Sequence, residues 1–264
     1  MSMLPKDALK GKTAIVTGGG TGIGKAIAKE FARLGASVVV ASRKLENLEQ
    51  TVREIEAEGG VGYALTVDVR DPVQVQRMAD ATVERFGSID ILVNNASGIF
   101  AVPAERMSYN AWKAVTSIIM DGTFLCTQAA AKQMIKQGKG GSILNLLTPM
   151  VWTGNPGTMH NIAAKSGVYS MTQSLAVEWA KYRIRVNALA PGFVPTKNSQ
   201  DQVFATEEAQ RSLLAAIPWG RFGTAEEMAL LASYMVSDYA DYVTGAMFVI
   251  DGGAWLNKGV FPYE

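Results

Sequence analysis

Short apolar runs alternate with longer segments of helical periodicity along almost the whole chain. Short apolar runs bounded by turn residues are typical of buried strands, whereas apolar residues three or four positions apart predict amphipathic helices. The pattern predicts seven strands, at residues 13–16, 37–41, 61–69, 91–93, 142–147, 186–190 and 247–250. It predicts helices at about residues 23–34, 45–55, 108–137, 163–182 and 225–236, and one more that begins after residue 71.

This alternation predicts an α/β fold: a doubly wound, Rossmann-like domain with a parallel seven-stranded sheet and helices on both faces. The strands are apolar on both sides, as strands buried between two helical layers are. No linker, internal repeat or low-complexity tract interrupts the pattern, so we expect residues 1–264 to form one domain. Ligands of such sheets bind beyond the carboxyl ends of the strands, which places the chemistry in the segments that follow them.

The most informative of these segments is residues 17–24, TGGGTGIG, between the first strand and the first helix. Glycines permit a tight turn and let the backbone approach a pyrophosphate, and the helix N-terminus that follows offers N–H groups to the phosphates. A glycine-rich turn alone also fits an ordinary tight turn. Its position between a strand and a helix favours a dinucleotide site.

The end of the second strand indicates which dinucleotide is bound. An acidic residue there would accept hydrogen bonds from the ribose of NAD, whereas a basic residue accommodates the 2′-phosphate of NADP. The chain has Ser42, Arg43 and Lys44, and no acidic residue before Glu46, which favours NADP(H) over a merely solvated basic pair. Asp68, after the third strand, fits the adenine edge and a plain turn equally well.

Composition excludes several classes of function. The chain has 48% hydrophobic residues, and its 25 Lys and Arg balance 24 Asp and Glu, which gives no basic footprint for nucleic acid or an anionic membrane. Cys126 is the single cysteine and lies in a predicted helix, where packing is the expected role. We see no targeting segment, membrane span or metal-site pattern, and expect a cytoplasmic protein.

Four motifs together resemble those of the short-chain dehydrogenase/reductase family. They are TGGGTGIG at 17–24, NNA at 94–96, AAK at 163–165 and PG at 191–192, and their spacing fits over essentially the whole chain. The resemblance implies a nicotinamide cofactor and a homotetramer. With the reasoning above it gives these cofactor-binding residues: Gly18, Gly20, Thr21, Gly22, Ile23, Arg43, Lys44, Asp68, Val69, Asn95, Ala96, Lys165, Pro191, Gly192 and Val194, with Thr196 close by.

The middle and the end of the chain look like the 2,4-dienoyl-CoA reductase branch of that family. The segments that carry this likeness are NNASGIF at 94–100, ERMSYNAWK at 105–113, DGTF at 121–124, LAVEWAKY at 175–182, GRFG at 220–223 and DGGAWL at 251–256. The branch implies a reductase that uses NADPH to reduce a conjugated acyl-CoA thioester in fatty acid metabolism.

The expected proton-handling residues differ from the family pattern. Carbonyl reductases of the family have a Tyr four residues before the Lys, where this chain has Asn161, and their Asn on the long central helix falls at Ile119. The dienoyl-CoA reductase branch has a Ser at position 161, and has a Tyr and an Asn where this chain has Met150 and Ile99. Candidate catalytic residues are therefore Lys165, Asn161 and Thr148.

The residues next to these candidates also have expected roles. His160 is either a proton relay or a structural residue at the start of the helix, and Trp152 and Met159 are expected to line an acyl pocket. A substrate lid is expected at about residues 195–217, with Phe204, Leu213 and Leu214, and Trp219 just beyond it. Two other functions stay open: a carbonyl or 3-oxoacyl reductase with an altered acid, and a non-catalytic NADP-binding protein.

Overall fold

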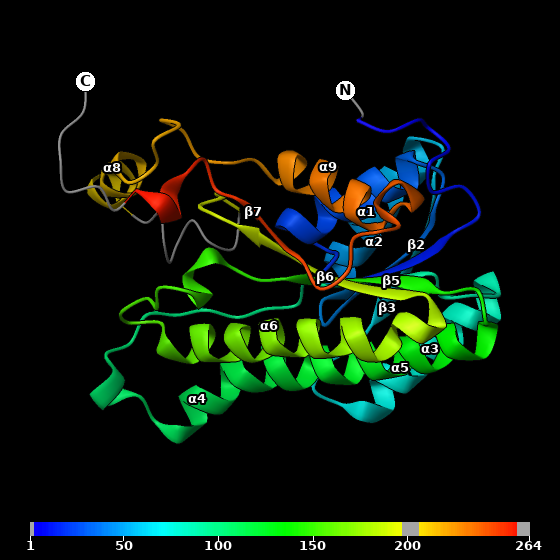
Figure 1. Ribbon diagram of the computed structural model, residues 1–264, viewed down its shortest axis with the longest axis horizontal. Helices are drawn as coiled ribbons and strands as arrows, with labels where there is room; N and C mark the ends of the chain where they lie inside the picture. Colours follow the sequence, from blue (N-terminus) through cyan, green and yellow to red (C-terminus); the bar gives the residue numbers. More distant parts are fainter. Residues whose placement is uncertain (1–2, 197–205, 258–264) are drawn as a thin grey trace.

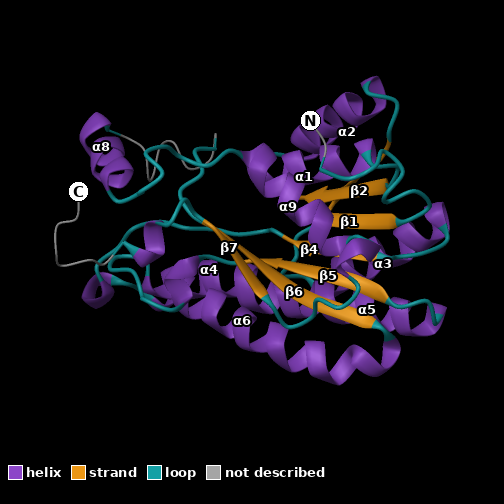
Figure 2. Cartoon of the chain, turned by 45° about the horizontal axis from the view of Figure 1, so that its top comes forward, coloured by secondary structure: helices purple, strands orange, loops and turns teal. Residues whose placement is uncertain are grey.

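A parallel sheet between two layers of helices forms the centre of the molecule in the computed structural model (Figures 1 and 2). The structure describes residues 3–196 and 206–257. The strands are β1 (Thr13–Thr17), β2 (Ser37–Ser42), β3 (Val61–Thr66), β4 (Ile91–Asn94), β5 (Gly141–Leu146), β6 (Ile184–Pro191) and β7 (Met247–Ile250). All neighbouring strands are parallel, in the order β3-β2-β1-β4-β5-β6-β7. This confirms the predicted doubly wound sheet.

Helices cover both faces of the sheet. They are α1 (Gly22–Arg33), α2 (Leu45–Ala57), α3 (Pro72–Phe86), α4 (Tyr109–Thr116), α5 (Gly122–Gln137), α6 (Met159–Trp179), α8 (Glu207–Ala215) and α9 (Ala225–Val236). Their ends follow local signals: Asp71 caps the N-terminus of α3 and Gly87 ends it in a left-handed conformation, with φ of 83°. Within the described ranges, none of the helices combines the length and hydrophobicity that crossing a bilayer requires.

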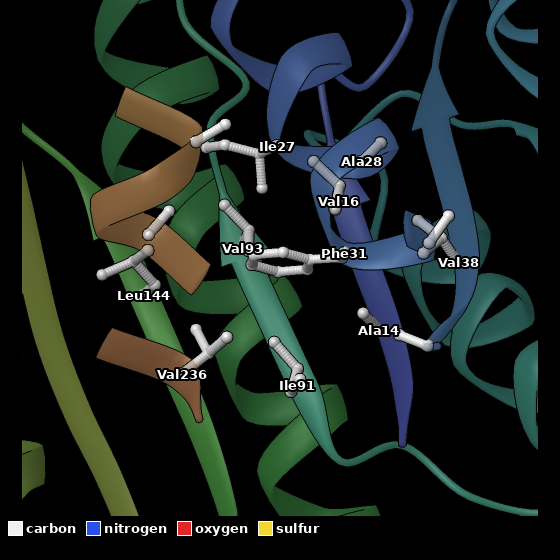
Figure 3. Packing of buried hydrophobic residues seen from close by; sticks show 14 of the residues in the cluster. Ala14, Val16, Ile27, Ala28, Phe31, Val38, Ile91, Val93, Leu144 and Val236 are labelled. Carbon is white, nitrogen blue, oxygen red and sulfur yellow. The ribbon is translucent and has the colours of Figure 1, made fainter. Parts of the chain in front are cut away.

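Alternate residues of the strands point to opposite faces of the sheet, where the two largest of three hydrophobic clusters lie. Val16 of β1 lies in the cluster with α1, α2 and α9, where Phe31 of α1 packs among side chains of β1, β4 and α9 (Figure 3). Ile15, one residue earlier, lies in the cluster on the other face, with α3, α5 and α6. Cys126 of α5 is buried in that second cluster, which agrees with the packing role expected for it.

A chain of buried amides and hydroxyls joins β4 and β5 to the helices behind them. Asn94 Nδ2 donates to Thr127 Oγ1 at 2.8 Å and to Asn145 Oδ1 at 2.9 Å, and Asn145 Nδ2 donates to Thr172 Oγ1 at 2.9 Å. Hydrogen-bonded buried polar groups restrict how their neighbours can be arranged, because breaking these bonds would leave further buried groups unpaired. The ends of β4 and β5, where the site begins, are thereby fixed against α5 and α6.

Several elements differ from the predicted ones, most of them by one or two residues at an end, and three differences are larger or change the type of helix. The third strand ends at Thr66 rather than at 69, because the chain turns at Asp68, whose N–H donates to Gln74 Oε1 at 3.0 Å. Helix α6 begins four residues before 163, because the carbonyl of Thr158 accepts from the N–H groups of Asn161 and Ile162. The predicted helix 108–137 is present as α4 and α5, joined by a π-helical turn at Ser117–Asp121.

Candidate active site

A cavity of about 510 Å³ lies beyond the carboxyl ends of β1, β2, β3 and β4. Eleven of the residues that the sequence assigns to a cofactor line it: Gly18, Gly20, Thr21, Gly22, Ile23, Arg43, Lys44, Asp68, Val69, Asn95 and Ala96. The cavity is therefore built from the turn after each of these four strands, as expected for a ligand site of a doubly wound sheet.

The glycine turn forms one wall of this cavity, and two of its glycines have conformations that side chains rarely adopt. Gly18 has a φ of +66°, and a Cβ there would lie 2.7 Å from Asn95 Nδ2. Gly22 has a φ of +54°, and a Cβ there would lie 3.1 Å from Cγ2 of Thr196 across the cavity. Gly22 and Ile23 also open α1, whose first N–H groups have no partners within the helix. Bare backbone beside a helix N-terminus fits a pyrophosphate.

Thr17 and Asn95 join the glycine turn to the loop after β4. The Thr17 hydroxyl accepts hydrogen bonds from the backbone N–H groups of Asn95 at 3.0 Å and Ala96 at 3.1 Å, and donates to Val93 O at 3.2 Å. In return, Asn95 Nδ2 donates to the carbonyls of Thr17 at 3.0 Å and Gly18 at 3.2 Å. Two walls of the cavity are therefore fixed to each other before any ligand arrives.

The far end of the cavity is rich in cations. Arg43 and Lys44 line it at the end of β2, on the side where Asp68 follows β3. The carboxylate of Asp68 accepts hydrogen bonds from Arg70, with Nε to Oδ1 at 2.9 Å and Nη2 to Oδ2 at 2.5 Å. This pairing, with a smaller contribution from the charge of Arg43, lowers the pKa of Asp68 to about 2. Arg70 is paired with Asp68, whereas Arg43 and Lys44 line the cavity, and this arrangement suits a ligand that carries an additional phosphate.

Helix α6 brings two of the three candidate catalytic residues, Lys165 and Asn161, to the ends of β5 and β4. Lys165 is 7% exposed and donates a hydrogen bond to the carbonyl of Leu146, and burial lowers the pKa of its ammonium to about 8. One turn earlier, Asn161 Nδ2 donates to the carbonyl of Gly98 at 2.9 Å. The structure therefore joins Asn161 to the cavity wall, because Gly98 lines the cavity.

Thr148 begins the short turn Pro149–Val151 after β5. Its hydroxyl oxygen accepts a hydrogen bond from the N–H of Met150 at 3.4 Å. A hydroxyl has one proton to donate, and among the described residues that proton has no acceptor. Thr148 is thus a donor that a substrate oxygen can use.

His160 packs against the loop after β4 without forming a hydrogen bond. Its ring is fully buried and lies against Phe100, with ring centroids 4.5 Å apart and planes at 47°. Both ring nitrogens are buried and unpaired within the described part of the chain, and burial lowers the pKa of the imidazole. A neutral imidazole with no partners on either nitrogen has the surroundings of a packing residue rather than of a proton relay.

Some sequence assignments lie outside this cavity, and some lining residues had no assignment. Lys165, Pro191, Gly192 and Val194 do not line it, and neither do Asn161 and Thr148. The lining residues that were not assigned to the cofactor are Ala41, Ser42, Asn47, Val67, Ser97, Gly98, Ile99 and Ile118. Most of these residues lie at a strand end next to an assigned motif, and this position alone could have identified them as lining residues. Asn47 and Ile118 lie inside helical stretches and have no such signal.

The expected substrate lid is described only in part. Residues 197–205 of it, including Phe204, lie outside the described residues. The rest contains α8, on which Leu213 and Leu214 are half-buried, and ends at the buried Ile217. Trp219, just beyond, is 71% exposed.

Comparison with known proteins gives concordant results. The family model described as enoyl-(acyl carrier protein) reductase matches residues 18–254. A Bacillus subtilis protein named probable 2,4-dienoyl-CoA reductase is 44% identical over 96% of this chain and 99% of its own length. A solved short chain dehydrogenase from Bacillus anthracis is 42% identical, with a TM-score of 0.87 over 96% of this chain and 100% of that chain.

A further solved structure contains a cofactor. It comes from Agrobacterium tumefaciens, is described as a candidate 2-deoxy-d-gluconate 3-dehydrogenase, and has bound NADP. It is 36% identical and covers 97% of this chain and 100% of that chain, with a TM-score of 0.88.

Proposed function

Because the chain belongs to the short-chain dehydrogenase/reductase family of oxidoreductases, we propose that it reduces a conjugated acyl-CoA thioester of the 2,4-dienoyl type with NADPH. The observation that carries this proposal is the amide side chain at position 161 and its hydrogen bond to Gly98. Asn161 lies where carbonyl reductases of the family have their proton-donating Tyr, and one N–H of its amide is already bonded to Gly98. An amide cannot give up a proton near neutral pH, so the reaction must not need an acid there.

The residues of the cavity, together with Lys165 of α6, fit NADPH. The bare backbone of the glycine turn fits the pyrophosphate, and Arg43 and Lys44 fit the phosphate on the adenosine ribose. The fixed loop at Asn95 and Ala96 fits the adenosine and ribose, and the ammonium of Lys165 fits the nicotinamide ribose. Such a cofactor supplies a hydride when bound, and the NADP in the Agrobacterium tumefaciens structure supports this choice.

A dienoyl thioester needs hydrogen-bond donors at its oxygen rather than an acid at a carbonyl. When a nucleophile adds to the far end of the conjugated system, negative charge develops on the thioester oxygen. The chain offers the unused proton of the Thr148 hydroxyl and the second N–H of Asn161 to stabilise that charge. The ammonium of Lys165 adds positive charge on the same helix. A proton then reaches the α-carbon from solvent.

Two measurements test this function together. NADPH binding is measured by calorimetry, and NADPH oxidation is followed at fixed protein concentration with 2,4-hexadienoyl-CoA, with saturated acyl-CoA, and with a panel of ketones and aldehydes. We expect oxidation with the dienoyl thioester and none with the saturated one. Turnover of ketones alone would favour a carbonyl reductase, and tight NADPH binding without turnover on any panel would favour a non-catalytic binding protein.

We further propose that the protein is a homotetramer and that residues 195–217 close over the substrate. The tetramer is expected from the family, and light scattering coupled to size-exclusion chromatography tests it directly.

Proteolysis within 195–217, measured with and without NADPH and thioester, tests the lid. Protection by both ligands together, and not by NADPH alone, is the expected result.

A further inference from the structure

Among the described residues that line the 510 Å³ cavity, Asp68 is the single acidic one. Thr66 of β3 pairs with Ser42 of β2, and Val67 N donates to Ser42 O at 2.9 Å. Arg43 and Asp68 therefore leave two neighbouring strand ends and line the same cavity. A carboxylate at this place opposes a phosphorylated ligand in two ways, because it repels the phosphate and attracts the cation that would bind it.

Arg70 binds the carboxylate of Asp68 at both of its oxygens. Arg70 Nε donates to Oδ1 at 2.9 Å and Nη2 donates to Oδ2 at 2.5 Å, and the backbone N–H of Arg70 donates to Oδ1 at 3.0 Å. A planar guanidinium matches a carboxylate in this two-point geometry, which makes the pair stronger and better defined than a single contact. Arg70 does not line the cavity, so its effect on a ligand there passes through Asp68.

The side chain of Arg43, in contrast, has no hydrogen bond or ion pair within the described part of the chain, and neither has that of Lys44. Its charge still acts on Asp68. The bonds from Arg70, and to a smaller extent the charge of Arg43, lower the pKa of the Asp68 carboxyl to about 2. The carboxylate is therefore ionised at neutral pH, and two guanidinium groups compete for it. Arg70 is the one that holds it, which leaves Arg43 available to a ligand.

The turn that carries Asp68 is held by bonds that do not involve the side chain of Arg70. Asp68 N donates to Gln74 Oε1 at 3.0 Å, and Gln74 Nε2 donates to Asp71 Oδ2 at 2.8 Å. Asp71 N in turn donates to the carbonyl of Asp68 at 3.0 Å. Substitution of Arg70 therefore frees the carboxylate while the backbone beneath it keeps its position.

We propose that Arg70 is a positioning residue for the choice of cofactor: it occupies the carboxylate of Asp68, keeps Arg43 unpaired, and so favours NADPH over NADH. This inference rests on the proposed function, in which Arg43 and Lys44 bind the additional phosphate of NADPH. Without Arg70, Asp68 and Arg43 pair across the two strand ends, and the phosphate meets a carboxylate in place of a free cation. Arg70 thus contributes to selection without touching the cofactor.

The test compares the dissociation constants of NADPH and NADH, because the turn at Asp68 affects both cofactors, whereas only one carries the phosphate. Fluorescence titration of the free protein gives both values. In Arg70→Gln we expect NADPH to bind about three- to fivefold more weakly, at the upper end of the effect of exposed ion pairs, and NADH to change by less than about twofold. Arg70→Lys keeps the charge and should restore most of the ratio. Arg77→Gln, which removes an exposed arginine of α3 that does not line the cavity, is the control and should leave the ratio unchanged.

A double-mutant cycle separates this role from a purely structural one. Asp68→Asn has no carboxylate to neutralise, so the addition of Arg70→Gln should leave the ratio of the two dissociation constants unchanged. An unaltered ratio in Arg70→Gln alone overturns the proposal. So does an equally large shift in the Asp68→Asn background, which would mean that Arg70 acts without Asp68. The proposed function is judged separately, on the original protein, by its preference for NADPH and by NADPH oxidation with a dienoyl thioester.

Discussion

The side-chain amide of Asn161 donates a hydrogen bond of 2.9 Å to the carbonyl of Gly98, which ties the first turn of α6 to the wall of the 510 Å³ cavity. One N–H of the amide is used in this way, and the bond fixes the direction of the second. The side chain at this position is therefore a neutral donor whose orientation is fixed by the bond to Gly98.

Replacement of Asn161 should therefore affect turnover more than cofactor binding. In Asn161→Ala we expect kcat with a dienoyl thioester to fall by about 100-fold, the usual cost of one oxyanion donor. The NADPH dissociation constant should change by less than about tenfold, since a single neutral hydrogen bond to Gly98 is lost. Asn161→Asp is the control of similar shape that also lacks donors. An unchanged kcat in both variants would remove Asn161 from the catalytic residues.

The hydroxyl of Thr17 should contribute to stability and to cofactor binding together. Thr17→Val leaves the N–H groups of Asn95 and Ala96 without their acceptor, and we expect a loss of about 2 kcal/mol in the free energy of unfolding. NADPH binding should weaken as well, because the two cavity walls are no longer joined. Thr17→Ser keeps the oxygen and should remain close to the original protein. Equal stabilities for the Val and Ser variants in urea titrations would contradict this account.

Arg43 should discriminate between NADPH and NADH. Charge-assisted hydrogen bonds contribute about 1.5–3 kcal/mol, so Arg43→Ala should raise the dissociation constant of NADPH by about 10- to 100-fold. The dissociation constant of NADH should hardly change, since NADH lacks the phosphate. Arg53→Ala, on the exposed side of α2, is the control. An equal loss for both cofactors, measured by calorimetry, would show that Arg43 does not select the phosphate.

His160 should make the protein less stable in mild acid. Burial lowers its pKa in the folded state, so the unfolded chain takes up a proton first as the pH falls below about 6.5. The free energy of unfolding then decreases by up to about 1.4 kcal/mol per pH unit until the pH reaches the lowered folded-state pKa.

His160→Leu removes both the titration and the two unpaired nitrogens. The variant should be more stable by about 1–3 kcal/mol at neutral pH, and the difference should grow as the pH falls. Urea titrations at several pH values between 5 and 7 give this difference. A constant difference across that range would mean that His160 finds a partner for its proton.

The dissociation constant of NADPH should begin to depend on pH near pH 8, because of Lys165. Burial lowers the pKa of its ammonium to about 8, so the positive charge is lost as the pH rises through that value. The dissociation constant of NADPH, followed by fluorescence titration of the free protein, should therefore increase above pH 8 and stay constant below it. Lys165→Met should bind weakly at every pH, without this pH dependence. Lys132→Met, exposed on α5, should keep it.

Much of the lining of the 510 Å³ cavity can be predicted from the sequence, because its residues follow strand ends next to strong local signals. The glycine turn, Arg43 with Lys44, and Asn95 with Ala96 are all of this kind, and all line the cavity. Ile118 is not, because its position depends on the π-helical turn at Ser117–Asp121, for which the periodicity of the segment gives no sign.

The contacts around the candidate catalytic residues depend on tertiary structure. The bond from Asn161 to Gly98 joins residues 63 positions apart, and the contact between Trp152 and Trp255 joins two different strand ends. Helical periodicity also placed the start of α6 four residues too late, since the bonds to Thr158 that extend it leave no mark on apolar spacing. A single sequence shows which residues are present at the site, but not which of them touch.

Because Cys126 is buried, the rate at which its thiol reacts reports how often the surrounding core opens. The thiol is 1% exposed in the core behind β4 and β5, and burial raises its pKa to about 12, so in the folded protein it is almost never an accessible thiolate. Oxidants and alkylating agents therefore reach it only when α5 separates from the sheet. Because no other cysteine competes, the rate of labelling counts those excursions directly, without any engineered probe.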